Sequence, residues 1–341
     1  MIGVEKDASI RFLFEPIAQW LDDPDITEIA INRPYELWIE KASKWTCFEV
    51  KELEFDRLMS MATSVASFTE NNISITTPIL SAVLPRGERV QFVIPPACEA
   101  GTVSITIRKP SLISRTLADY QNDGFFDRIR PISNQLSPID SKLLALHQQN
   151  QIMEFLRLAV ISEKNIVIAG GTGSGKTTFM GALIEEIPLS ERLITIEDVH
   201  ELLLKSHANK VHLLYPSEAL PSDPVTSAKL LKSCLRMKPD RILLAELRGA
   251  ETFDFINVNA SGHGGSITSC HAGSCTLTFE RLAMMAMQNP QGQALPYDVI
   301  KKLLFQVVDI VIHVHNEIHA LDPKDLGRYI TEIWFDPTTK K

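Results

Sequence analysis

The sequence predicts a chain of two domains, a smaller α+β domain followed by a larger α/β domain with a doubly wound, mostly parallel sheet. A length of 341 residues fits about two domains. From residue 141 onward, short apolar strand patterns alternate with helix patterns, which is typical of the α/β class. A glycine-rich loop stands directly between one such strand and the next helix. We therefore expect domains at residues 1–111 and 141–341, with an interdomain linker at 112–140.

The first domain combines helix patterns with strand patterns. Apolar residues at helical spacing predict helices at residues 12–21 and 55–68, the first ended by the run Asp22-Asp23-Pro24-Asp25. The strand patterns stop at turns rich in asparagine, proline or glycine. The predicted strands are residues 26–31, 36–40, 87–94 and 101–108.

The linker has weak apolar periodicity and several turn signals. These are Asn122-Asp123-Gly124, Arg130-Pro131 and Ser137-Pro138. We expect an extended connection with a little helix.

The second domain alternates strands and helices from its first residues. A helix pattern runs from Ser141 to Val160, and the apolar run 166–169 then leads into the glycine-rich loop. This order predicts a doubly wound sheet with its ligand at the carboxyl ends of the strands. Further strands are expected at 192–196, 211–214, 241–245, 265–269 and 309–313, and helices at 178–187, 226–237, 251–260, 279–287 and 297–304.

Composition excludes several classes of protein. The chain has no apolar run of the roughly 18 residues that a membrane span needs, and its first residues do not resemble a signal peptide. Five cysteines without framework spacing suit a reducing cytosol. A net charge of −8 argues against a general nucleic-acid binder.

The glycine-rich loop is a complete phosphate-loop motif, G-x-x-x-x-G-K-T. Its backbone N–H groups would surround phosphate oxygens, and the N-terminus of the next helix adds positive potential. Lys176 would reach the β- and γ-phosphates, and the Thr177 hydroxyl would bind Mg²⁺. The chain is therefore predicted to bind a nucleoside triphosphate. The nucleotide-binding residues expected are Gly171, Thr172, Gly173, Ser174, Gly175, Lys176, Thr177 and Thr178.

An acid at the end of a strand is the first candidate for chemistry. The strand at 241–245 is followed by Glu246, placed as P-loop enzymes place a carboxylate beside the phosphate loop. Glu246 could hold Mg²⁺ through water, and because it is Glu rather than Asp we favour activation of the attacking water. Arg248 would either hold Glu246 or face a neighbouring subunit.

Two adjacent acids at another strand end form the second candidate. Glu197 or Asp198, after the strand at 192–196, could complete the Mg²⁺–water shell. Capping of a helix by Asp198 is the structural alternative. The predicted Mg²⁺ ligands are thus Thr177, Glu197 and Glu246.

Histidines in a glycine-rich segment, 261–272, are the third candidate. His271 follows a predicted strand and could donate a hydrogen bond to the γ-phosphate, and His263 lies on the preceding bend. Cys270, His271 and Cys275 lack a second ligand pair, so a zinc site is not expected.

These blocks resemble, in type and order, the secretion ATPase superfamily of type IV secretion, type II secretion and type IV pili. That superfamily carries a phosphate loop, an acidic box, a strand ending in Glu and a histidine box. The N-terminal half is similar to the type IV secretion branch, and the four-cysteine zinc module of type II enzymes is missing. The matching segments are 20–28 with 32–34, 84–85 with 87–89, 107–110, 170–178, 192–200, 241–249 and 262–271.

The resemblance implies the hexameric traffic ATPase of a type IV secretion or conjugation apparatus. It implies a PAS-like N-terminal domain, a RecA-like C-terminal domain, and ATP with Mg²⁺ as ligands. It also implies partners among the inner-membrane components and coupling ATPases of the apparatus, with peripheral attachment to the cytoplasmic face. Arg108 matches the family's strand-end arginine and would bring positive charge to the γ-phosphate, with Arg89 and Arg115 as weaker candidates. The long linker resembles the subset in which neighbouring subunits exchange domains.

Other functions remain open at this point. A type II secretion or pilus ATPase, a nucleotide-gated ring scaffold with little turnover, and a small-molecule kinase all use a phosphate loop. The N-terminal domain argues against a kinase, because it would have no role in that enzyme. A DNA translocase is disfavoured by the acidic balance, so no strong direct nucleic-acid binding is expected. Phe12, Phe14 and Trp20 could aid membrane docking, although core positions suit them better.

Overall fold

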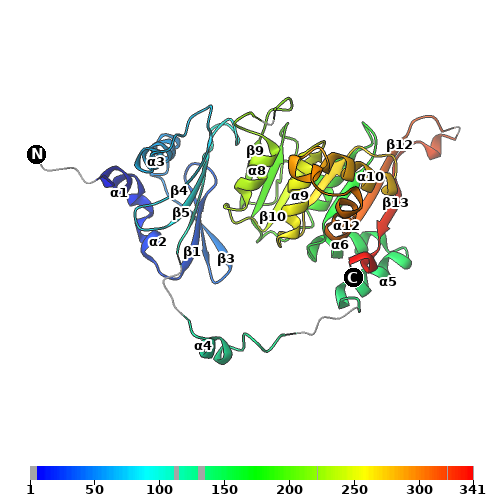
Figure 1. The fold of residues 1–341 in the computed structure, drawn as a ribbon, viewed down its shortest axis with the longest axis horizontal. Coiled ribbons are helices and arrows are strands. Elements are labelled where there is room, and N and C mark those ends of the chain that lie inside the picture. The colour runs from blue at the N-terminus through cyan, green and yellow to red at the C-terminus, as the bar shows by residue number, and fades with distance from the viewer. Residues whose placement is uncertain (1–5, 111–114, 130–134, 221, 321, 341) are drawn as a thin grey trace, which may run out of the picture.

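The computed structural model describes residues 6–110, 115–129, 135–220, 222–320 and 322–340. Figure 1 shows two domains next to each other, each built on its own sheet, and a connection that carries helix α4 below both. The predicted α+β domain followed by an α/β domain is confirmed. No helix within these ranges is both long enough and apolar enough to cross a membrane.

The first domain is a six-stranded antiparallel sheet in the order β3-β2-β1-β6-β5-β4. Helices α1 and α3 contact each other, and their apolar side chains join those of the strands in one core. The elements are α1 (Ala8–Phe14), η1 (Glu15–Ile17), α2 (Ala18–Asp22), β1 (Ile26–Ile31), β2 (Glu36–Lys41), β3 (Lys44–Glu49), α3 (Phe55–Phe68), β4 (Ile79–Val83), β5 (Arg89–Val93) and β6 (Ser104–Arg108).

Two predictions for this domain need correction. The helix expected at 12–21 begins earlier and breaks into α1, η1 and α2, because Pro16 in η1 has no N–H to continue the helical ladder. Strand β3 escaped prediction since it is an edge strand without a buried alternating face, and β4 was also missed. Phe14 is buried and Trp20 packs against the core, whereas Phe12 is exposed.

In the linker, the described residues 115–129 contain one short helix. Helix α4 (Leu117–Asn122) begins with a capping box between Thr116 and Asp119. Helix α5 (Pro138–Gln148) begins before the predicted boundary, because Ser137 accepts the N–H of Asp140. The single helix expected from Ser141 to Val160 is two helices, since Asn150 has a φ of 58° and ends the run.

The second domain is a seven-stranded sheet in the order β13-β12-β7-β11-β10-β8-β9. All neighbouring pairs are parallel except β12 and β13. Strand β7 is buried on both faces, as a parallel strand between helical layers must be. The strands are β7 (Ile166–Ala169), β8 (Leu193–Glu197), β9 (Lys210–Leu214), β10 (Arg241–Leu247), β11 (Ile267–Cys270), β12 (Ile310–Glu317) and β13 (Gly327–Phe335).

Helices cover both faces of this sheet, and each face has its own apolar core. One core contains side chains of α8, α9, α10 and α12, and the other contains those of α5, α6 and α7. This arrangement is the doubly wound architecture that the sequence predicts. The helices are α6 (Ile152–Ile161), α7 (Lys176–Ile184), α8 (Ser227–Cys234), α9 (Glu251–Ala260), α10 (Cys275–Ala286), α11 (Pro290–Gln293) and α12 (Tyr297–Val307), with the short turns η2 (Pro323–Asp325) and η3 (Pro337–Lys340).

A fully buried arginine joins the two domains. Arg192, just before β8, donates hydrogen bonds to the side-chain oxygens of Asn32 and Asn209, each at 2.6 Å. Its Nε donates to the Met237 carbonyl at 3.0 Å. Burial lowers the pKa of Arg192 to about 10, although nearby acids, Asp240 first, oppose that shift.

We expect Arg192→Leu to destabilise the contact between the domains. The change leaves the buried Asn32 oxygen without its donor and removes one of the two donors to the Asn209 oxygen. A buried polar group left unpaired in this way costs about 1–3 kcal/mol. Urea unfolding measures the loss. Arg157→Leu, at an exposed ion pair with Glu186, is the matched control and should cost about 1 kcal/mol or less. Equal effects of the two changes would contradict the role given to Arg192.

Candidate nucleotide-binding site

The phosphate loop follows β7 and leads into α7. Gly175 is the N-cap of α7 with a φ of 92°, a left-handed conformation that favours glycine. A Cβ at Gly170 would collide with the Val314 carbonyl oxygen of β12. Glycines at these positions thus allow the turn and the close approach of β12. Ser174 Oγ donates to the Gly171 carbonyl at 2.9 Å, which braces the loop.

Lys176 is buried beneath the loop. Its Nζ donates to the carbonyl oxygens of Gly170 and Gly171, each at 3.0 Å. Burial lowers the pKa of Lys176, and the charge of Glu246 opposes that shift. Thr177 and Thr178 are exposed in the first turn of α7, where the helix dipole favours an anion. The predicted loop residues therefore lie together in one turn at the N-terminus of α7.

Two strand ends bring charged groups together near Lys176. Arg248 Nε donates to Glu246 Oε2 at 2.7 Å, and the Arg248 guanidinium also binds Asp198. Burial alone would raise the pKa of Asp198, but hydrogen bonds from Arg248 and Ser217 lower it overall. Burial would lower the pKa of Arg248, but the same bonds to Glu246 and Asp198 raise it. Arg248 therefore bridges Asp198 and Glu246 and holds the Glu246 carboxylate in place.

One oxygen of Glu246 has no hydrogen-bond donor. Its Oε1 is buried, and within the described ranges nothing donates to it. His271 Nε2 lies 3.0 Å away, but the contact does not have hydrogen-bond geometry. A buried carboxylate oxygen of this kind needs a cation or a water molecule. The site therefore fits a water molecule or the water shell of Mg²⁺, with Glu246 and Thr177 as the oxygen donors.

Glu197, one of the predicted Mg²⁺ ligands, has both carboxylate oxygens bonded to groups of its own strand and the following turn. Its Oε1 accepts the Thr195 hydroxyl at 2.7 Å, and its Oε2 accepts the backbone N–H groups of Glu201 and Leu202 at 2.9 and 2.8 Å. These bonds, together with His212, lower the pKa of Glu197 against the effect of burial. Consecutive residues of a strand face opposite sides of the sheet, so Asp198 meets Arg248 while Glu197 does not.

The neighbours of Glu197 also differ from a Mg²⁺ site. The nearest metal-ligating atoms of Glu197, His200 and His212 all lie within 4.8 Å of one another. Two imidazoles and one carboxylate are a donor set for transition metals, whereas Mg²⁺ prefers oxygen. Glu197 holds the end of β8 in this structure.

Comparison with known proteins decides the family. The profile of the type II/IV secretion system protein family matches residues 13–316. The chain belongs to the type II/IV secretion system protein family. It is 58% identical over 341 residues to the type IV secretion system protein VirB11 of Brucella abortus (99% of this chain and 93% of that protein), and 44% identical over 333 residues to a PtlH homologue of Bordetella bronchiseptica (97% and 96%).

A solved structure agrees with the fold. The crystal structure of the VirB11 ATPase from the Brucella suis type IV secretion system, in complex with sulphate, has a TM-score of 0.92 and 58% identity. The match covers 98% of this chain and 99% of that one. The N-terminal domain and the RecA-like domain expected from the sequence are thus confirmed by the likeness to this structure.

Arg108 lies apart from the phosphate loop of its own chain. Its Nε is 3.4 Å from Glu28 Oε1, in a pocket of about 200 Å³ between the domains. The lining includes Arg89 and His263, but no residue of the loop. Burial raises the pKa of Glu28 to about 7, although Arg108 opposes that shift. His263 thus lines the pocket around Arg108, whereas His271 lies beside Glu246. Arg115 forms an ion pair with Asp123 in the linker.

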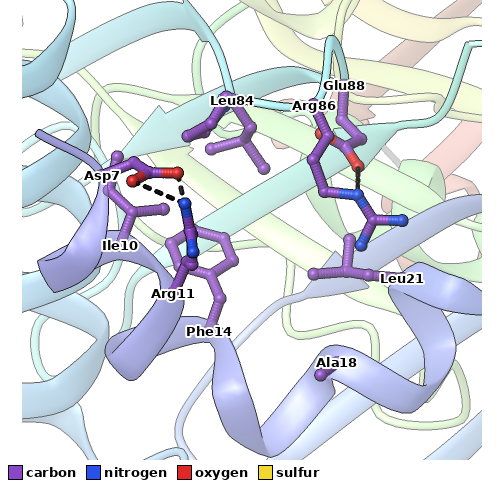
Figure 2. A pocket seen from close by; sticks show the side chains of 10 residues that line it. Asp7, Ile10, Arg11, Phe14, Ala18, Leu21, Leu84, Arg86 and Glu88 are labelled. Carbon is purple, nitrogen blue, oxygen red and sulfur yellow. Dashed lines mark hydrogen bonds and ion pairs between the residues drawn. The ribbon is translucent and has the colours of Figure 1, made fainter. Parts of the chain in front are cut away.

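Figure 2 shows a different pocket, formed inside the first domain by α1, α2 and the turn after β4. Its volume is about 210 Å³, and its walls are mainly apolar. An ion pair between Asp7 and Arg11 and another between Arg86 and Glu88 lie around it. No residue of the phosphate loop lines this pocket.

One cation at the loop escaped sequence analysis. Arg328 of β13 donates from Nε to the carbonyl oxygen of Gly173 at 3.2 Å. The strand itself was not predicted, and 155 residues separate the partners along the chain. Only the packing of the β12–β13 hairpin beside β7 brings them together.

Proposed function

We propose that this protein is the ATP-hydrolysing motor of a type IV secretion apparatus. The observation that carries the proposal is the phosphate loop with the charged group Glu246, Arg248 and Asp198 beside it. Relatives named as type IV secretion proteins over nearly the whole chain support the same conclusion. The reaction is transfer of the γ-phosphoryl group of ATP to water.

In this proposal each residue of the site has its own role in hydrolysis. The loop N–H groups and Lys176 bind the phosphates, and the exposed Thr177 hydroxyl binds Mg²⁺. Mg²⁺ would neutralise charge that develops on the phosphates. Glu246 Oε1 accepts a proton from the attacking water, and Arg248 fixes the carboxylate through its other oxygen. His271 lies beside the same carboxylate and hydrogen-bonds the γ-phosphate.

The working form in this proposal is a ring of six identical subunits. Arg108 supports a ring because no phosphate-loop residue of its own chain lines the pocket in which it lies, and because it is more than half exposed. An arginine placed in this way acts on nucleotide held by a neighbour. The ring would lie on the cytoplasmic face of the inner membrane, attached through membrane components and coupling ATPases of the apparatus.

The test is phosphate release from ATP by the purified protein, with mass measured by light scattering. A six-subunit mass with turnover in the absence of any acceptor supports the motor and excludes a kinase. A six-subunit mass that forms only with a non-hydrolysable analogue, without turnover, would replace the motor with a nucleotide-gated scaffold. A monomer without turnover, even with lipid and analogue added, would contradict both.

Mixing two defective variants tests whether Arg108 acts between subunits. Arg108→Ala should lower turnover about tenfold or more, because a charge-assisted contact with phosphate is lost. In a ring mixed equally with Lys176→Ala, about a quarter of the sites combine an intact loop with a neighbour's intact arginine. We expect turnover above that of either variant alone. Turnover no greater than the average of the separate variants would mean that Arg108 does not act in trans.

A further inference from the structure

The β12–β13 hairpin forms one wall of the phosphate loop. Strand β12 pairs in parallel with β7, which carries the loop. The Val314 carbonyl approaches Gly170 so closely that only a glycine fits there. Strand β13 pairs with β12 on the outer side. The hairpin therefore cannot shift without moving its contacts with the loop.

An irregularity in the hairpin turns Arg328 toward the loop. His313 opposes Glu332, but Val314 opposes Ile330, so Thr331 is an extra residue on β13. Beyond this bulge Arg328 opposes Asn316 and shares the face of Val314. In a regular ladder Tyr329 would take that place, because a slip of one residue exchanges the two faces. Bulges often re-aim side chains next to active sites.

Arg328 packs tightly on the loop. A Cβ added to Gly175 would lie 2.8 Å from Arg328 Cδ and 3.3 Å from its Nε. The Arg328 side chain thus passes close to the turn where α7 begins, and its Nε donates to the Gly173 carbonyl at 3.2 Å. This is the place where a phosphate loop presents its N–H groups to an anion.

The loop has two cations whose acceptors are uncharged. Lys176 Nζ binds the carbonyl oxygens of Gly170 and Gly171, and Arg328 binds that of Gly173. Among the described residues, neither cation has a carboxylate within 4.0 Å, whereas Arg248 contacts two acids. Two cations bonded to neutral oxygens around a phosphate-loop turn form a positively charged site that suits an anion. A guanidinium binds phosphate by two parallel hydrogen bonds, which is stronger than its bond to a carbonyl.

We propose that Arg328 is a second cation of the phosphate site, which exchanges the Gly173 carbonyl for a phosphate group of the nucleotide bound in the same chain. The proposal rests on the nucleotide binding proposed above. It adds a contact in cis to Lys176, distinct from the neighbour's arginine, and it links occupancy of the loop to the β12–β13 hairpin.

The experiment measures dissociation constants of ATP and of pyrophosphate by calorimetry. We expect Arg328→Ala to weaken both about tenfold or more, because one charge-assisted contact is lost. Arg328→Lys should recover part of the affinity, since it keeps the charge without the fork. Lys324→Ala, at an exposed lysine of the same hairpin paired with Asp322, is the matched control and should bind as the wild type does. Because Arg328 is exposed, the thermal unfolding midpoint of the Arg328→Ala protein should equal that of the wild type.

Comparison with Lys176→Ala separates the possible results. Wild-type affinity of Arg328→Ala for both ligands, with binding lost in Lys176→Ala, overturns this inference and leaves the proposed function standing. Weakened ATP binding with unchanged pyrophosphate binding overturns it too, because Arg328 would then contact the nucleoside. Wild-type affinity in both variants would contradict nucleotide binding at the loop itself.

Discussion

Lys176→Ala is expected to reduce the affinity for ATP about 100-fold and to bring turnover below about a thousandth of the wild-type value, since it removes the main cation for the β- and γ-phosphates. In this structure Lys176 is buried against two neutral carbonyls, and burial lowers its pKa. These surroundings disfavour the charged form of Lys176. Its removal should therefore change the unfolding midpoint little, because relief of this burial offsets the loss of the two hydrogen bonds. Calorimetric titration, phosphate release and thermal unfolding measure the three quantities.

The control for this prediction is Lys302→Ala, at an exposed lysine of α12 in the same domain. We expect it to bind and hydrolyse ATP like the wild type. A Lys176→Ala protein with wild-type affinity would show that the loop does not hold the triphosphate. A large fall in its unfolding midpoint would mean that Lys176 stabilises the fold, contrary to the physical argument from its burial.

Glu246→Gln is expected to bind ATP with nearly wild-type affinity but to hydrolyse it about 10²–10⁴ times more slowly, the range typical of a lost general base. The amide keeps the shape of the side chain and an oxygen that can accept from Arg248. It cannot take a proton from water. Single-turnover phosphate release measures the chemical step, and a titration with a non-hydrolysable analogue measures binding.

Glu251→Gln is the matched control on the same segment. Glu251 caps the turn after β10, where its Oε1 accepts the N–H groups of Arg248 and Gly249 at 2.6 and 2.8 Å. An amide oxygen can accept the same bonds, so turnover should stay within a few-fold of the wild type. Wild-type turnover in Glu246→Gln would remove Glu246 from the mechanism. Equal losses in both variants would indicate a distorted turn instead of a lost base.

Local patterns were sufficient for much of the fold and for the centre of the site. The phosphate loop is contiguous in sequence, so its conformation follows from glycine spacing between a strand and a helix. Glu246 was predictable because the carboxyl end of a buried parallel strand always reaches the ligand edge of the sheet. A little helix was expected in the linker from the turn signals, but the bounds of α4 came only from the structure. Edge strands β3 and β13 lack a clear buried face, so their patterns were not visible.

Interactions between distant segments decided the rest. Adjacent acids at a strand end look equivalent in sequence, and only packing directs Asp198 to Arg248 and Glu197 to Thr195. Arg328 reaches Gly173 because a bulge reverses the faces of β13.

The sequence alone determined that this protein has a phosphate loop with a strand-end glutamate beside it, because both depend on short-range spacing. The tertiary structure decided which other charges share that site, because charged side chains find their partners only when separate strands are aligned in one sheet.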